Sequence, residues 1–277
     1  MSKIFLAAFL SFNVFAQSAT SLENTSETNL SGFSLEKVAP DRISYFGDMA
    51  GPSLETSANA ADGETGEIVE NSLSLWNQVS FQWKINDNYR FTVNPRWIQN
   101  FNPGPDDRNF EYDSPVVGIA GTYYQNGDFS FGGAINTITP MTRDRGHQEI
   151  DLLYNPGGFQ WVNYKIDDRW TAGLWLWGRF YVYEGEAPLT EELADYLWAP
   201  IATYAVNDSV SVSTFYQYTG ERFLNGDAVN HKDDSLNVMF SAKVGNVTIQ
   251  PILRAFRATS FNLADANLNM WISAQLF

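Results

Sequence analysis

The chain contains no cysteine. Disulfide bonds therefore cannot hold it together, which excludes the small disulfide-stapled folds that are common among exported proteins. Basic residues are also scarce, because 17 Lys and Arg stand against 32 Asp and Glu and give a formal net charge of −15. This balance argues against a nucleic acid as a partner. Nothing in the sequence predicts a cofactor.

Long apolar runs are missing as well. No window of about 18 residues lacks polar groups, so the sequence predicts no transmembrane helix. A short apolar run, Ile4–Leu10, follows Lys3 and precedes a small-x-small site at 14–16. This arrangement is typical of a secretory signal peptide, which we expect to span residues 1–16. Residues 17–40 are rich in Ser, Thr, Asn and Glu without periodicity, and we interpret them as a flexible periplasmic segment.

From residue 41 onward, short stretches of alternating apolar and polar residues predict β-strands. Five tight turns separate pairs of these stretches, at 86–88, 126–128, 167–168, 207–208 and 245–246, and six longer connections lie near 50–70, 101–114, 139–150, 184–195, 223–233 and 258–266. Short turns on one side and long loops on the other are typical of outer-membrane barrels. The sequence therefore predicts an all-β fold over 41–277, a transmembrane up-and-down antiparallel β-barrel of about twelve strands.

A soluble β-sandwich behind the same leader is the main alternative, and a propeller would need a repeated signature that the sequence lacks. The position of aromatic residues favours the membrane barrel. One predicted belt lies beside the tight turns (Trp83, Tyr89, Tyr164, Trp170 and Tyr204) and a second toward the long loops (Tyr45, Phe46, Trp97 and Tyr183). Such belts mark membrane interfaces. We therefore expect apolar side chains to face outward and hydrated ones to face the interior.

The last strand, 267–277, ends on Phe277. In this it resembles bacterial outer-membrane β-barrel proteins, whose terminal Phe is read by the barrel insertion machinery, although the apolar residues here lie one position out of the usual register. In strand number and charge pattern the chain also resembles the small twelve-stranded monomeric porins for acidic sugars. The resemblance implies location in the bacterial outer membrane, contact with its lipid and lipopolysaccharide, and a role as a porin-like channel.

Cations predicted on strands cannot face lipid near the bilayer midplane, where each Lys or Arg costs roughly 2–4 kcal/mol. We therefore expect the inward set to line the lumen and bind solutes: Lys84, Arg90, Arg96, Arg179, Lys243 and Arg254. Since nearly all carboxylates fall in predicted loops, the sequence predicts a basic lumen and passive diffusion of small hydrophilic solutes, with a preference for anions. Bulky inward residues leave a non-conducting structural or adhesive barrel open as the alternative (Trp175, Trp177, Tyr181 and Phe215).

Enzyme and metal chemistry are not predicted. The acidic loops lack the spaced D-x-D-x-D-G pattern of a calcium loop, so we interpret them as solvated charge rather than as divalent-cation sites. Some twelve-stranded barrels hydrolyse lipids with a histidine two residues before a serine nucleophile. Here His147 and His231 precede Glu149 and Asp233 at that spacing. A barrel lipid hydrolase is therefore a weaker alternative, and we expect no catalytic residues.

Overall fold

The structure is a computed structural model that describes residues 39–53, 60–61, 68–69, 73–101, 109–138, 152–183, 192–224, 229–254 and 266–277. The predicted leader, 1–16, and nearly all of the predicted segment 17–40 lie outside these ranges. All described strands belong to the unit Pro40–Phe277. Among the described residues, no helix is long and apolar enough to cross a membrane.

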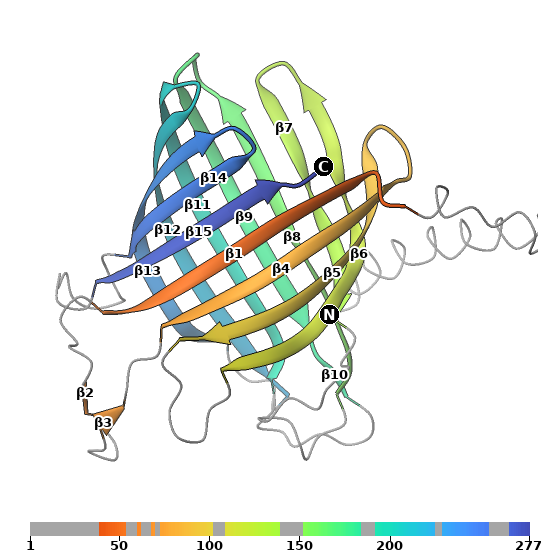
Figure 1. The fold of residues 1–277 in the computed structure, drawn as a ribbon, viewed down its shortest axis with the longest axis vertical. Coiled ribbons are helices and arrows are strands. Elements are labelled where there is room, and N and C mark those ends of the chain that lie inside the picture. Colours follow the sequence, from red (N-terminus) through yellow and green to blue (C-terminus); the bar gives the residue numbers. More distant parts are fainter. Residues whose placement is uncertain are drawn as a thin grey trace, which may run out of the picture. The chain divides into compact units, whose positions relative to one another are not determined.

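Antiparallel strands form a closed barrel (Figure 1). The ring consists of β1 (Arg42–Ser53), β4 (Ser74–Lys84), β5 (Tyr89–Asn100), β6 (Phe110–Asn126), β7 (Phe129–Ile138), β8 (Leu152–Lys165), β9 (Trp170–Phe180), β11 (Glu192–Asn207), β12 (Val210–Phe223), β13 (Val229–Val244), β14 (Val247–Arg254) and β15 (Asn267–Gln275). Each strand pairs with the next, and β15 pairs with β1 to close the ring. The predicted twelve-stranded up-and-down barrel is confirmed.

Three two-residue strands lie outside this ring. The thirteenth member of the large sheet, β10 (Val182–Tyr183), pairs with β8. A separate small sheet pairs β2 (Ala60–Ala61) with β3 (Ile68–Val69), within the first predicted long connection.

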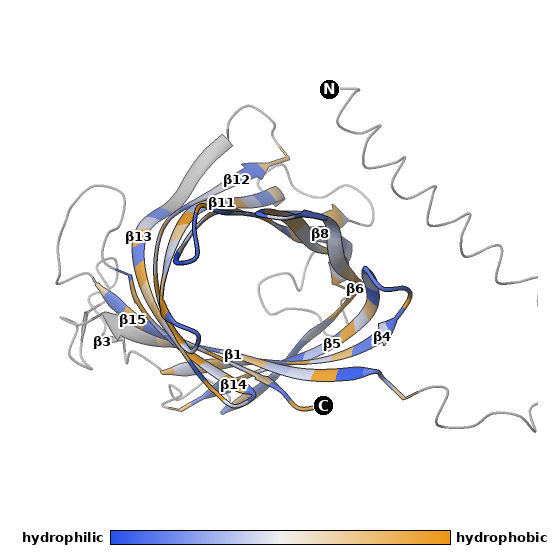
Figure 2. Ribbon diagram, turned by 90° about the horizontal axis from the view of Figure 1, so that it is seen from above, coloured by the Kyte–Doolittle hydropathy of each residue, from blue (hydrophilic) through white to orange (hydrophobic). Residues whose placement is uncertain are grey.

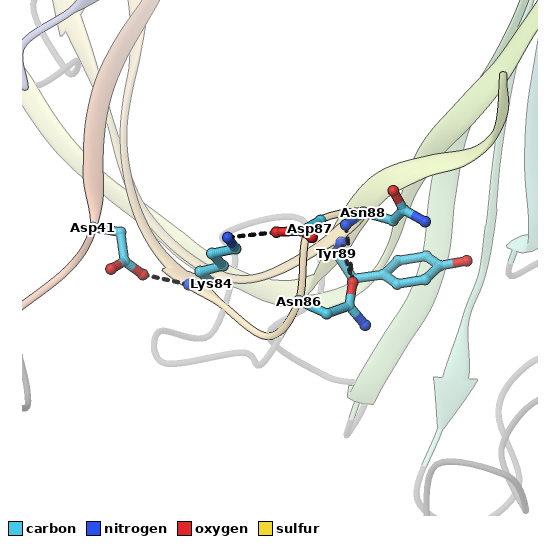
Figure 3. Close-up of polar contacts among 6 residues, drawn as sticks. All are labelled: Asp41, Lys84, Asn86, Asp87, Asn88 and Tyr89. Atoms are coloured by element: carbon cyan, nitrogen blue, oxygen red, sulfur yellow. Dashed lines mark hydrogen bonds and ion pairs between the residues drawn. The ribbon is translucent and has the colours of Figure 1, made fainter.

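Five short turns join strands at one end of the barrel, the upper end in Figure 1. In three of them, the first side chain of the turn accepts hydrogen bonds from the backbone of the turn. The Oδ1 atoms of Asn86, Asp167 and Asn207 each accept hydrogen bonds of 2.7–2.9 Å from the backbone N–H groups two and three residues later, as Figure 3 shows for Asn86. The other two turns place Gly127 and Gly245 at φ of 51° and 63°, where a side chain would be strained. All five turns were predictable because their signals are local.

The strands extend further into the predicted long connections than the sequence indicated. Residues 110–114 belong to β6, 192–195 to β11 and 229–233 to β13. Their acidic residues suggested solvated loops. The register instead pairs Asp113 with Arg96 and Asp195 with Arg179. A carboxylate that meets an arginine is compatible with a strand, which is why charge alone gave the wrong boundary.

One cross-barrel contact identifies the inward face. The rings of Trp175 on β9 and Trp271 on β15 have centroids 6.2 Å apart, although these strands are not neighbours. Side chains of separated strands meet only inside a closed ring. Because paired residues share a face and successive residues alternate between faces, this contact and the registers fix the inward positions on every strand. Figure 2 shows the ring from above.

The outer wall carries large apolar side chains that remain exposed, among them Ile135 (48%), Phe240 (53%) and Leu268 (52%). A wall of this kind fits contact with lipid rather than with water. The predicted belt beside the short turns lies on this outer face, where Trp170 packs against Tyr204 with ring centroids 5.0 Å apart. The prediction that Phe46 belongs to the second belt is wrong, because Phe46 points inward and contacts Trp271.

The expectation of a hydrated interior is wrong for part of the barrel. A buried apolar cluster of Ala199, Phe215, Met239 and Ile252 lies inside it, and Trp175 and Trp271 pack against this cluster. Inward positions here carry apolar side chains that pack against those of neighbouring strands and against Trp175 and Trp271, which shields them from water.

Candidate functional site in the barrel interior

Aromatic side chains cross the middle of the interior. Besides its contact with Trp271, Trp175 lies 5.5 Å from Phe215. Phe46 lies 6.0 Å from Trp271 and 6.1 Å from Trp76, both edge-on. We call these five residues the aromatic cluster. Phe215 belongs to the buried apolar residues of β11–β14, whereas Phe46 and Trp76 extend the aromatic cluster onto β1 and β4.

The opposite side of the lumen, along β4–β7, is lined by different side chains. Large apolar side chains occupy some of its inward positions, namely Trp76, Val116 and Ile138. Toward the short turns its inward positions are small or polar, and they include Ser80, Gln82, Thr92, Asn94, Gly118, Ala120, Ala134 and Asn136. Asn94 donates a hydrogen bond of 3.4 Å to Thr92. The short-turn half of this side is therefore small and polar, in contrast to the buried apolar cluster on β11–β14.

Arginine and aspartate side chains meet near the long-connection ends of the strands. Arg96 Nη2 lies 3.0 Å from Asp113 Oδ2, and the indole nitrogen of Trp76 donates to the same oxygen over 3.3 Å. Arg96 Nε also donates to the carbonyl oxygen of Ser114 over 2.8 Å. The carboxylate is thus held by one cation and one aromatic donor.

Two further aspartates lie near an arginine and accept a hydrogen bond from an aromatic side chain. The Trp271 side chain donates a hydrogen bond to Asp48, which also attracts Arg254 electrostatically. Tyr181 donates to Asp195 over 2.7 Å, and Asp195 is the register partner of Arg179. We call these groups the three arginine–aspartate triads. Each contains one positive and one negative charge, so an aspartate lies near each of the predicted lumen residues Arg96, Arg179 and Arg254.

Cations at the short-turn end behave differently. Two of them are paired with aspartates of the adjacent turns: Lys84 Nζ lies 2.6 Å from Asp87 and Lys165 Nζ lies 2.8 Å from Asp168. Hydrogen bonding to the lysine, and then its charge, lowers the pKa of each aspartate. Figure 3 shows the first pair, together with the bond from the Lys84 backbone N–H to Asp41.

Three inward cations at this end have no ion-pair partner within the described part of the chain: Arg42, Arg90 and Lys243. The Nε atoms of Arg42 and Arg90 are buried and make no hydrogen bond to any described group. These three inward positions therefore carry positive charge that no described carboxylate pairs with.

A cavity of about 740 Å³ opens among the ends of β1, β13, β14 and β15, and we call it the vestibule. Arg42 and Lys243 line it together with Ser44, Thr248 and Ser273. Phe46 also lines it, so the vestibule reaches the aromatic cluster. Closure of the ring makes this site, because β1 and β15 come from opposite ends of the chain.

The six predicted lumen cations all occupy inward positions, but the structure divides them between the two ends. Lys84, Arg90 and Lys243 lie at the short-turn end, and the other three belong to the triads. The sequence analysis missed Arg42, although its alternation with Ser44 and Phe46 was visible. It also missed Asp48, whose partner Arg254 is far away in the chain.

Histidine and metal chemistry were also considered from the sequence. His147 lies outside the described residues, and His231 lies in β13, where its backbone pairs with Gly220. Among the described residues, no group of three His, Asp or Glu side chains is arranged to hold a metal ion.

No protein-family model matches the chain, and no curated protein matches it. Among solved structures, the chain is similar to an outer membrane channel from Pseudomonas putida F1, with 10% identity over 86% of this chain and 96% of that one and a TM-score of 0.57. The KdgM porin, solved with disordered oligogalacturonate, is 10% identical over 85% of this chain and 99% of its own, with a TM-score of 0.48. At such identities similarity shows the fold alone: the chain has the fold of a porin-like outer-membrane barrel.

Proposed function

We propose that the protein is a channel of the bacterial outer membrane through which small hydrophilic solutes diffuse passively, with a preference for anions. In this orientation the short turns face the periplasm and the long connections face the outside. Solutes pass along the polar side of the lumen, lined by β4–β7, because the aromatic cluster fills the other side.

The observation that carries the anion preference is the unmatched charge of Arg42, Arg90 and Lys243. Fixed positive charge at a narrow mouth raises the local concentration of anions. The triads add little selectivity, since their charges cancel. We therefore place the selective part of the channel at the short-turn end.

Planar-bilayer recording tests this function. We expect discrete conductance steps and, across a potassium chloride gradient, a reversal potential that indicates anion preference. Replacing Arg42, Arg90 and Lys243 together by Ser should move the reversal potential toward cation preference. The matched control removes one cation and one anion at once, by Arg96→Ser with Asp113→Ser, and should leave the preference in place. Absence of conductance would refute the channel.

A non-conducting structural or adhesive barrel is the second candidate. The contact between Trp175 and Trp271 favours it, because rings that meet across the lumen reduce the open cross-section. The bilayer recording decides between the two candidates, since the structural barrel predicts no current even with both rings removed.

The proposal treats the protein as non-enzymatic. In support, the residues two positions after His147 and His231 are Glu149 and Asp233 rather than serine. Liposomes containing the purified protein should release no fatty acid above the empty-liposome rate. Release that His147→Ala abolishes would identify a hydrolase instead.

We also propose that residues 1–16 are a cleaved leader and that the C-terminal strand is recognised during insertion. The backbone bonds between Ile43 and residues 276 and 277 support a role for the C-terminus in closing the ring. The protein recovered from outer membranes should begin at Gln17. A variant that lacks Phe277 should accumulate in the periplasm, whereas the substitution Phe277→Ala tests the aromatic ring alone.

A further inference from the structure

The vestibule combines two features that a site for simple inorganic ions does not need. Arg42 and Lys243 provide unmatched positive charge, and Phe46 provides an aromatic wall that continues into the cluster around Trp271. Hydroxyl groups of Ser44, Thr248 and Ser273 lie between the two. We propose that the vestibule binds small carboxylic acids whose body is aromatic or otherwise apolar.

The charged end of the proposed ligand is assigned from the guanidinium of Arg42. Its Nε–H is buried and makes no hydrogen bond to any described group. Nε and one terminal nitrogen form the fork that accepts a carboxylate in bidentate fashion. An unsatisfied buried donor costs free energy, which a bound carboxylate would recover. Lys243 adds a second donor from the facing strand β13.

The apolar end of the ligand is assigned from Phe46. Phe46 lines the vestibule, and its ring contacts Trp76 and Trp271 in the aromatic cluster. A fully hydrated anion would leave this wall facing water, whereas an apolar body would cover it. A volume of about 740 Å³ is within the range of small-molecule pockets.

This inference rests on the proposed channel function for its biological role, but binding is measured without transport. Benzoate, acetate, benzyl alcohol and benzylamine are titrated into the protein in detergent micelles, with tryptophan fluorescence and calorimetry as readouts. Benzoate should bind at least about tenfold more tightly than each of the other three, since each lacks the apolar body or the negative charge. Equal affinity for benzoate and benzyl alcohol, or for benzoate and acetate, would overturn the assignment.

Variants locate the site. Arg42→Gln and Lys243→Gln should each weaken benzoate binding about tenfold. Phe46→Ala should weaken benzoate binding and leave acetate binding unchanged. Lys165→Gln, which removes a cation outside the vestibule at the same end, is the matched control and should bind benzoate normally. Should Arg42→Gln fail to fold, Lys243→Gln keeps the assignment open to refutation, because Lys243 is exposed.

Failure of the site and failure of the channel are distinguishable. Benzoate binding without any conductance would support the binding site and refute the channel function. Anion-selective conductance without benzoate binding would support the channel function and refute the binding site. Unchanged binding in both Arg42→Gln and Lys243→Gln would place the carboxylate elsewhere and refute the proposal.

Discussion

The rings of Trp175 and Trp271 lie 6.2 Å apart, although β11, β12, β13 and β14 separate their strands on one side of the ring. The contact therefore spans the lumen between two strands that are not neighbours. On one side of it lie the buried apolar residues, including Phe215 and Ile252. On the other lie the small and polar inward positions at the short-turn half of β4–β7. In the proposed channel, solutes would pass along the polar positions.

Removing one ring of this contact should enlarge the passage. We expect Trp271→Ala and Trp175→Ala to raise single-channel conductance, at a cost in stability of up to about 3–5 kcal/mol for each large-to-small change. The control is Trp198→Ala, because Trp198 lies on the outer face against Tyr216 and Tyr218 and should not affect the current. Unchanged conductance in all three variants would show that the contact between Trp175 and Trp271 does not narrow the passage.

The pair of Arg96 and Asp113 should behave as a buried ion pair. Arg96 is 8% exposed, so loss of one partner leaves an uncompensated charge. Asp113→Leu should lower the free energy of unfolding by about 3 kcal/mol because it leaves the buried Arg96 without its partner, and adding Arg96→Met should recover much of the loss. Urea unfolding in lipid vesicles measures both. Lys84→Met, which breaks an exposed pair, should change little by comparison. Additive effects of the two substitutions would show that the pair is not coupled.

The side-chain caps of the short turns should contribute measurably to stability. Asn86 accepts two backbone hydrogen bonds, so Asn86→Ala should lower the free energy of unfolding by about 1–2 kcal/mol. Asp167→Asn keeps an acceptor at the same atom and should be nearly neutral. Asn88→Ala, in the same turn as Asn86, supplies the comparison because it removes neither bond. The prediction fails if the two alanine variants at 86 and 88 are equally stable.

The turn aspartates should titrate below the usual range. Hydrogen bonding to Lys165 and the charge of Lys165 lower the pKa of Asp168. Because the folded-state pKa is below the unfolded value of about 4, the ion pair stabilises the turn above that pH and loses its contribution as the pH falls through the folded value. Carboxyl NMR titration of Asp168 measures this. Lys165→Met should return the pKa to its ordinary value; an unchanged pKa would rule out the lysine as the cause.

Local sequence was sufficient to predict the strands, the five short turns and the outward apolar face. Each depends on residues close together in the chain: period-two alternation, an Asx side chain capping the next few N–H groups, or a glycine at positive φ. Alternation also placed Lys84, Arg90 and Arg96 on one face of neighbouring strands, since no distant contact is needed for that.

Ring closure accounts for what could not be predicted. Arg42 and Lys243 line one cavity only because β15 pairs with β1. Asp48 meets Arg254, and Trp175 meets Trp271, across strands that are far apart in the chain. Alternation reveals which face a side chain is on, but it carries no information about what lies opposite across a closed lumen. The balance of charge and the apolar side of the interior are properties of the assembled ring for that reason.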